Sequence, residues 1–162
     1  MNRKIALIFI LFLSSPVLAE LKSTTPAQAC NLMIEAGLST RGWKNHYDQE
    51  FGCSSPYKDI GSALPLPNNL AFYAEGNRDF VKLVKLVLNV NDRSTASSAN
   101  KQLQKAAAIL FQKTTSERIP QSVINAIVNG KSMSQKVGIS QVDVIRDNWP
   151  TGKGYEIKVV IK

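Results

Sequence analysis

The N-terminal segment constrains the fold most, because it decides in which compartment the chain folds. Residues 1–19 have the parts of a secretory signal peptide: basic Arg3 and Lys4, an unbroken run of nine apolar residues at 5–13, and a polar stretch ending in Val17-Leu18-Ala19. Such a run spans only about 13 Å as a helix, against roughly 30 Å of bilayer hydrocarbon, so it is too short for an anchor. The alternative is a buried N-terminal helix. We expect cleavage after Ala19 and a periplasmic or secreted protein.

Export also determines the chemistry of the two cysteines, Cys30 and Cys53. An oxidising compartment favours a disulfide, and two thiols allow one connectivity. Closing this loop of about two dozen residues is expected to stabilise the fold by roughly 3 kcal/mol. The alternative is a free catalytic or metal-binding cysteine, but two cysteines and one histidine cannot complete a structural zinc site without carboxylates. We expect no metal and no cofactor.

Residues 20–162 are predicted to form a single domain. The chain of 162 residues is 44% hydrophobic, 7% aromatic and 20% charged, which excludes a disordered, collagenous or disulfide-dense protein. A domain takes roughly 150 residues, so the length leaves no room for a second one. No later stretch reaches the roughly 18 apolar residues of a membrane-spanning helix, so we expect no membrane span after signal cleavage.

The first part of this domain is predicted to contain a helix, a long irregular segment and a hairpin. Pro26 begins a short helix that ends at Gly37 and carries Cys30 on its apolar side. Residues 38–69 lack periodicity and are predicted to be irregular, with a short strand near 49–54. Two β-rich runs, 70–75 and 80–90, flank Gly76-Asn77-Arg78-Asp79 and predict a hairpin whose second strand is central in a sheet.

The second part is predicted to contain two helices and another hairpin. One helix starts at Asp92 or Ser94 and ends near Thr115, and the next runs from Pro120 to Gly130. Residues 131–138 are predicted to be a loop.

Alternation predicts a C-terminal hairpin around the turn Trp149-Pro150-Thr151-Gly152, with Val144 opposite Ile157. The order helix, hairpin, helix, helix, hairpin predicts an α+β fold. We expect an antiparallel sheet of about four to five strands with the helices packed on one face.

The search for catalytic residues gives little. His46 is the only histidine, so any Ser-His-Asp or Cys-His site must include it, and Asp48, Ser54 and Ser55 are the groups near it in the sequence. No nucleophile-elbow motif surrounds them. The last hairpin carries three acids that we interpret as cross-strand partners of basic residues rather than a glycosidase pair: Asp143, Asp147 and Glu156.

Aromatic residues gather around Cys53. In the structural interpretation they form a small satellite core on the disulfide, and in the functional one some are exposed and bind a partner protein or a sugar polymer. Basic residues lie at the rim of this segment. The candidate partner-binding residues are Arg41, Trp43, Lys44, Tyr47, Phe51 and Tyr57.

The chain is basic, and five of its lysines lie within residues 82–113. Arg3 and Lys4 are two of the 20 basic residues, so cleavage leaves 18 against 12 acidic ones, a formal net charge of +6. A basic exported protein can be attracted to anionic lipid or cell-wall polymer, although such charge is also common on an ordinary solvated face. The candidate anion-binding residues are Lys82, Lys85, Lys101, Lys105 and Lys113.

Several segments carry a resemblance to a known group of proteins. They are Gly42-Trp43, Phe51-Gly52-Cys53-Ser54-Ser55-Pro56-Tyr57, Asn68-Asn69-Leu70-Ala71-Phe72-Tyr73, Leu86-Val87-Leu88-Asn89-Val90-Asn91 and Trp149-Pro150-Thr151-Gly152-Lys153-Gly154-Tyr155. With these segments the chain resembles a family of small exported bacterial proteins that carry a domain of unknown function. The resemblance spans most of residues 20–162. It implies a bacterial envelope setting and no activity, cofactor or catalytic residue.

We therefore expect an exported envelope protein that acts as a non-enzymatic binding or interaction module. Its partner is expected to be a protein or an envelope polymer, and not a specific nucleic acid. One alternative is a small envelope hydrolase that uses His46. Another is a basic face that binds anionic lipid or cell-wall polymer, and this binding would be sensitive to salt.

Overall fold

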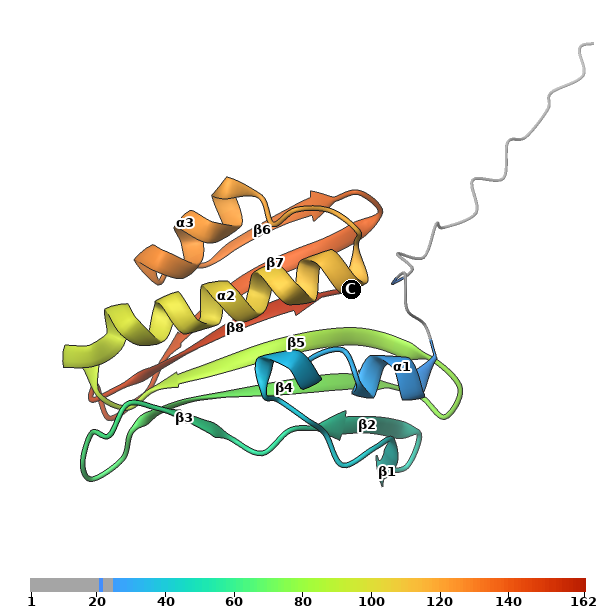
Figure 1. Ribbon diagram of the computed structural model, residues 1–162, viewed down its shortest axis with the longest axis horizontal. Helices are drawn as coiled ribbons and strands as arrows, with labels where there is room; N and C mark the ends of the chain where they lie inside the picture. Colours follow the sequence, from blue (N-terminus) through green and yellow to red (C-terminus); the bar gives the residue numbers. More distant parts are fainter. Residues whose placement is uncertain (1–20, 22–24) are drawn as a thin grey trace, which may run out of the picture.

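The hairpin of β4 (Asn68–Gly76) and β5 (Val81–Val90) forms the middle of a large sheet (Figure 1). The structure is a computed structural model that describes Leu21 and residues 25–162. The predicted signal peptide and its cleavage site lie outside the described residues. Valine and leucine dominate β5, and it pairs on both sides, as the central strand of a sheet does.

All strand pairings in the described part of the chain are antiparallel, and they join eight strands into one sheet. The order across the sheet is β1-β2-β4-β5-β8-β7-β6, and β3 pairs with β4 next to β2. The remaining strands are β1 (Lys44–Tyr47), β2 (Glu50–Ser54), β3 (Lys58–Ile60), β6 (Met133–Val137), β7 (Ser140–Asn148) and β8 (Tyr155–Ile161).

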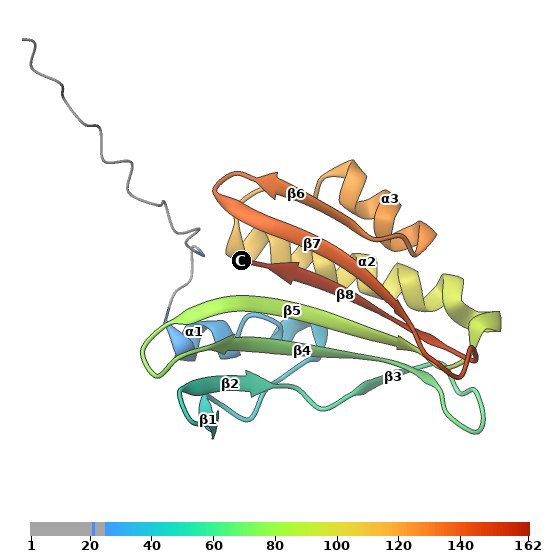
Figure 2. The same cartoon turned by 180° about the vertical axis from the view of Figure 1, so that it is seen from behind.

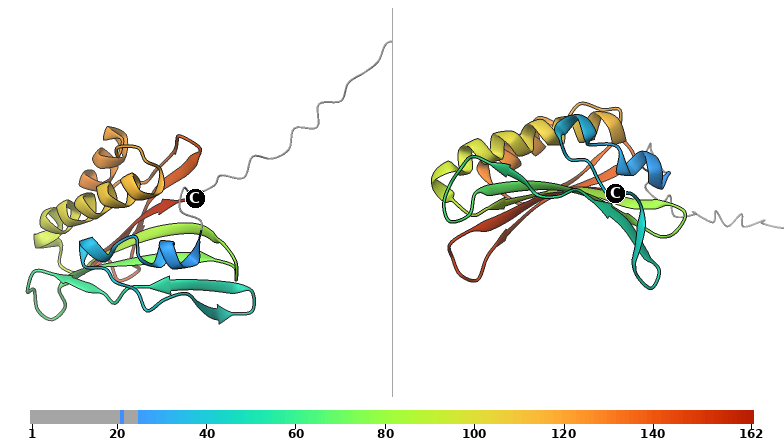
Figure 3. Two further views of the ribbon diagram at one scale, coloured as in Figure 1. Left: turned by 45° about the vertical axis from the view of Figure 1, so that its right-hand side comes forward. Right: turned by 60° about the horizontal axis from the view of Figure 1, so that its bottom comes forward.

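The helices lie together on one face of the sheet, which arches beneath them (Figure 3, right). The longest, α2, packs on β4 and β5 through small buried residues such as Ala99 and Ala107. None of the helices in residues 25–162 is long and apolar enough to cross a membrane. The helical elements are α1 (Pro26–Cys30), η1 (Ile34–Ala36), η2 (Arg93–Thr95), α2 (Ala96–Thr114) and α3 (Gln121–Asn129).

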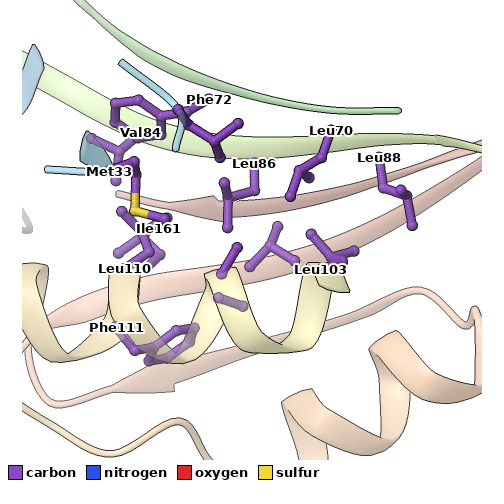
Figure 4. Close-up of a cluster of buried hydrophobic side chains, with 14 of the residues drawn as sticks. Met33, Leu70, Phe72, Val84, Leu86, Leu88, Leu103, Leu110, Phe111 and Ile161 are labelled. Atoms are coloured by element: carbon purple, nitrogen blue, oxygen red, sulfur yellow. The ribbon is translucent and has the colours of Figure 1, made fainter. Parts of the chain in front are cut away.

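The hydrophobic core lies between α2 and the sheet (Figure 4). Phe72 and Leu86 are paired across β4 and β5, and both are fully buried in the cluster that also contains Leu110 of α2. Alternation in β4 puts the next residues, Tyr73 and Glu75, on the opposite face. The core therefore uses one face of the sheet, and none of the helices within residues 25–162 lies on the other face.

A disulfide joins Cys30 of α1 to Cys53 of β2, with the two Cα atoms 5.9 Å apart. Both residues are buried. The predicted pairing is thus confirmed, and the bond fixes the N-terminal helix to the edge of the sheet. Next to it, Lys113 of α2 donates a hydrogen bond to the Leu32 carbonyl and pairs with Glu35.

The predicted α+β class with an antiparallel sheet is confirmed, but the number of strands is wrong. The strand predicted near 49–54 is present as β2, but the segment 38–69 also contains β1 and β3, and the predicted loop 131–138 contains β6. β1, β3 and β6 escape a search for alternation because they are short strands at the margins of the sheet: all four residues of β1 are exposed, and β3 has three residues. The N-terminal helix is also shorter than predicted, because it breaks after Cys30.

The predicted register of the C-terminal hairpin is wrong by two residues. Val144 lies opposite Val159, not Ile157. The turn itself forms as expected, since the Gly152 N–H donates to the Trp149 carbonyl at 2.9 Å. Lys153 and Gly154 lengthen the loop beyond this turn, so pairing begins at Tyr155 and the register moves. A shift of two residues keeps every side chain on its face.

Candidate functional site

The face of the sheet opposite the helices, here called the open face, is turned toward the viewer in Figure 2. It is carried by alternate residues of the central strands, among them Tyr73 and Glu75 of β4 and Lys85 of β5. It is not purely polar, because Ala71, Val87 and Val160 are buried on it at 0%, 5% and 6% exposure. The open face thus pairs a small apolar floor with charged and aromatic side chains.

At one edge of the open face the β1–β2 hairpin forms a cleft of about 470 Å³. The hairpin supplies His46 and Glu50, and β4 supplies Tyr73 and Glu75. We call this the sheet cleft. It is lined by His46, Glu50, Phe51, Cys53, Ser54, Tyr73, Ala74, Glu75, Gly76, Lys82 and Leu83.

Gly52 positions the imidazole of His46 over the sheet. A Cβ atom at position 52 would lie 3.3 Å from His46 Nε2 and only 2.7 Å from the Ala74 carbonyl oxygen. A separation below 3.0 Å from a backbone atom forces the backbone to move. The glycine therefore gives the histidine ring room against β2 and allows β2 to approach β4.

Tyr73 is held in the cleft by contacts with neighbouring side chains. Its hydroxyl donates to the Tyr57 hydroxyl at 3.3 Å, and Lys85 Nζ lies 5.1 Å from its ring centroid. Lys85 is itself held by Glu75 at 2.6 Å. Burial, followed by the hydrogen bond to Tyr57, raises the pKa of Tyr73, so its phenol stays neutral and offers a hydroxyl group and a ring face to a ligand.

The structure separates the aromatic residues around Cys53. Trp43 packs against the core and its indole N–H donates to the Asn77 carbonyl, which fits the structural interpretation. Phe51 is half-buried, with the Arg78 guanidinium 5.9 Å from its ring centroid. Tyr47 and Tyr57 are 79% and 58% exposed, as the functional interpretation requires of a binding residue. The rim residues Arg41 and Lys44 are exposed as well.

The five candidate anion-binding lysines do not form one surface. Lys82 lines the sheet cleft and Lys85 pairs with Glu75 on the open face. Lys101 and Lys105 are exposed on α2, on the other side of the sheet. Lys113 is engaged with Glu35 and the Leu32 carbonyl. These lysines are close in the sequence, but the fold places them on opposite sides of the sheet.

His46 shares the sheet cleft with Glu50, Glu75 and Ser54. No hydrogen bond links its ring to any described carboxylate or hydroxyl. Asp48 lies in the tight β1–β2 turn with φ 45°, and the buried Ser55 hydroxyl bonds to the Pro56 carbonyl. The described residues also contain no group of three or more His, Cys, Asp or Glu side chains able to hold a metal ion.

The three acids of the C-terminal hairpin bond to lysines on the open face. Lys158 contacts Glu156 at 2.7 Å and Asp147 at 2.9 Å, and these hydrogen bonds, Glu156 first, raise its pKa. Lys162 contacts Asp143 at 3.1 Å. Each carboxylate thus has a cation. Asp143 and Asp147 of β7 meet theirs across the hairpin, as the cross-strand interpretation proposed, whereas Glu156 and Lys158 both lie on β8.

Sequence reasoning missed Glu50, Tyr73 and Glu75 as cleft residues. The alternation within 68–76 would have placed Tyr73 and Glu75 on the face away from Phe72. Nothing in the local sequence brings them to His46, because that contact depends on the pairing of β2 with β4.

Comparison with known proteins assigns no family to this chain and no function to the cleft. No protein-family model matches the chain, no curated protein matches its sequence, and no solved structure matches its fold.

Proposed function

We propose that the protein is an exported, non-enzymatic binding module of the bacterial envelope that holds a glycan polymer in the sheet cleft. The observation that carries the proposal is the pair of exposed tyrosines beside a cleft lined by polar side chains. The expected signal peptide and the family resemblance supply the envelope setting, in which glycan polymers are abundant.

The aromatic side chains support stacking on sugar rings. A pyranose has an apolar C–H face, and a tyrosine ring offers a rigid apolar surface with a polar tip. Tyr57 is 58% exposed and is tied to the cleft through its contact with Tyr73. Tyr47 is 79% exposed and is paired in the sheet with Glu50, which lines the cleft.

The polar side chains favour a glycan over a protein partner. The centre of a protein interface is depleted of charged residues and is built around apolar anchors. The sheet cleft instead contains Glu50, Glu75 and Lys82, together with His46 and the hydroxyl of Ser54. These groups supply the donors and acceptors that sugar hydroxyls need at the edge of a stacked ring.

The test is co-sedimentation of the purified protein with peptidoglycan sacculi, with the bound fraction measured over a range of protein concentrations. We expect saturable binding and a roughly two- to tenfold loss of affinity in each of Tyr47→Ala and Tyr57→Ala. The matched control is Ile139→Ala, which removes another exposed apolar side chain, 66% exposed, at the opposite edge of the sheet. Its affinity should equal that of the wild type.

Three results would contradict the proposal. Absence of binding to sacculi, combined with capture of one envelope protein that depends on Tyr47, would favour the protein partner. Release of soluble fragments that stops in His46→Ala would favour a hydrolase. Binding that disappears at high salt but survives both tyrosine substitutions would favour a basic surface.

A further inference from the structure

A second pocket, separate from the sheet cleft, lies on the helical side of the sheet. It has a volume of about 320 Å³ and is bounded by α2, the end of α3 and the strands β7 and β8. We call it the Arg146 pocket. Its lining includes Ser97, Asn100, Lys101, Gly130, Arg146 and Tyr155.

The guanidinium of Arg146 is held rigidly in this pocket. Its carbon lies 3.7 Å from the ring centroid of Tyr155, a close stacking contact. Nη1 donates to the Gly130 carbonyl at 3.2 Å, and Nε donates to Asn148 Oδ1 at 3.1 Å. A Cβ at Gly130 would lie 2.6 Å from Nη1, so the glycine allows this approach. The guanidinium is thereby positioned by three separate contacts.

Arg146 has no acidic partner among the described residues, although its guanidinium always carries a charge. The two hydrogen bonds use two of the five N–H donors of the side chain and leave three for a ligand. A planar guanidinium with free donors matches the oxygen pair of a carboxylate or phosphate.

The surroundings of the pocket also favour an anion. Lys101 lines it, and Arg93 lies 5.8 Å from the ring centroid of Tyr155. Ser97 belongs to the first turn of the 19-residue α2, where backbone N–H groups carry partial positive charge. No acidic residue is among those that line the pocket. The nearby Asp92 carboxylate bonds to Ser94 and Thr95 instead.

Asn100, which lines the same pocket, provides an independent observation. Its side chain is 7% exposed, and its Nδ2 donates to the Val128 carbonyl at 3.3 Å. Its Oδ1 is buried and meets no donor in the described part of the chain. A buried acceptor without a donor is rare in native proteins and calls for a reason. A ligand with a hydroxyl or amine beside its acid group would provide a donor on this side of the pocket.

We propose that the Arg146 pocket binds a small oxyanion, a carboxylate or phosphate group, through the guanidinium of Arg146 and the ammonium of Lys101. The test is a two-dimensional NMR titration of the purified protein with sodium phosphate and with sodium acetate. Sodium chloride at matched ionic strength is the control for screening. We expect saturable shifts of the Arg146 Nε–H and of the Ser97 and Gly130 amides with at least one oxyanion, and none with chloride. The anion that binds more tightly identifies the ligand chemistry.

Two variants separate a specific site from general charge. Arg146→Lys keeps the charge but loses the planar fork, so affinity should fall roughly tenfold or more. Lys105→Gln removes an exposed charge of α2 that does not line the pocket and should bind as the wild type does.

The wild-type spectrum tests the site even if Arg146→Lys is poorly folded. The proposal is overturned if neither oxyanion gives saturable shifts at these three positions. It is also overturned if the shifts spread evenly over the surface lysines, or if folded Arg146→Lys binds as tightly as the wild type.

Discussion

Gly52 lies directly beneath the imidazole of His46, where a side chain at position 52 would be 3.3 Å from Nε2. The same added Cβ would lie 2.7 Å from the Ala74 carbonyl oxygen. Gly52→Ala should therefore push β2 away from β4 and displace the histidine ring. We expect a loss of about 1–3 kcal/mol in the free energy of unfolding, measured by urea denaturation.

Ser54→Ala on the same strand is the control for this experiment, because it removes one hydroxyl and introduces no new contact. It should change the stability by less than about 0.5 kcal/mol. Equal stability of Gly52→Ala and wild type would show that β2 and β4 leave room for a side chain at position 52.

The Cys30–Cys53 disulfide should be a major contributor to stability, because it ties α1 to the sheet. Its sequence separation of 23 residues corresponds to about 3 kcal/mol in the chain-entropy account. The double variant Cys30→Ala/Cys53→Ala should lose about this amount in urea unfolding, and wild type treated with reductant should behave in the same way. Two thiols that react with an alkylating reagent in protein taken from its native cell would contradict this.

Two buried asparagines should respond differently to truncation. Asn68 is fully buried and satisfies three partners: the carbonyl and N–H of Asp92, and the Thr95 hydroxyl. Asn100 has an unpaired Oδ1. Asn68→Ala should cost about 2–3 kcal/mol and Asn100→Ala about 1 kcal/mol or less, because the first removes three hydrogen bonds and the second removes one. Equal losses in the two variants would contradict the assigned hydrogen bonds.

Asp143 should make the protein sensitive to acid. Burial raises its pKa, but the hydrogen bonds from Ser134, Lys162 and Gln141 outweigh burial and lower it overall. The folded state therefore favours the ionised carboxylate. Its contribution is fully present above the unfolded pKa of about 4 and is lost as the pH falls through the lowered folded value.

Thermal melting between pH 7 and pH 2 tests this expectation. Asp143→Asn should be less stable than wild type at pH 7, and the difference should shrink below about pH 4. Asp59→Asn, at a side chain that is exposed and forms no ion pair with any described residue, is the control. A difference for Asp143→Asn that stays constant down to pH 2 would show that the carboxylate does not stabilise the fold.

Local sequence signals were sufficient to predict the elements in the interior of the fold. The β4–β5 hairpin, the helix that follows it and the pairing of Cys30 with Cys53 were predictable, because apolar runs, caps and a single pair of thiols carry this information. The edge strands were not, since the exposed β1 has no apolar side for alternation to reveal. The C-terminal register failed because Gly154 belongs to the loop and not to β8.

The candidate sites were less predictable than the fold. Tyr47 and Tyr57 were singled out from local aromatic density, but their exposure required the structure. The association of His46 with Tyr73 depends on long-range pairing, and the placement of Arg146 over Tyr155 depends on the shifted register of β7 and β8. Neither contact can be predicted from the residue types alone.

The most direct test of the proposed function is an NMR titration of the isotope-labelled protein with soluble peptidoglycan fragments. We predict that the amide signals that move belong to the sheet cleft and its rim, in β1, β2, Tyr57 and residues 73–76, and that those of α2 stay in place. Shifts confined to α2, or a spectrum that does not change at saturating fragment concentration, would contradict a glycan-binding cleft on the open face.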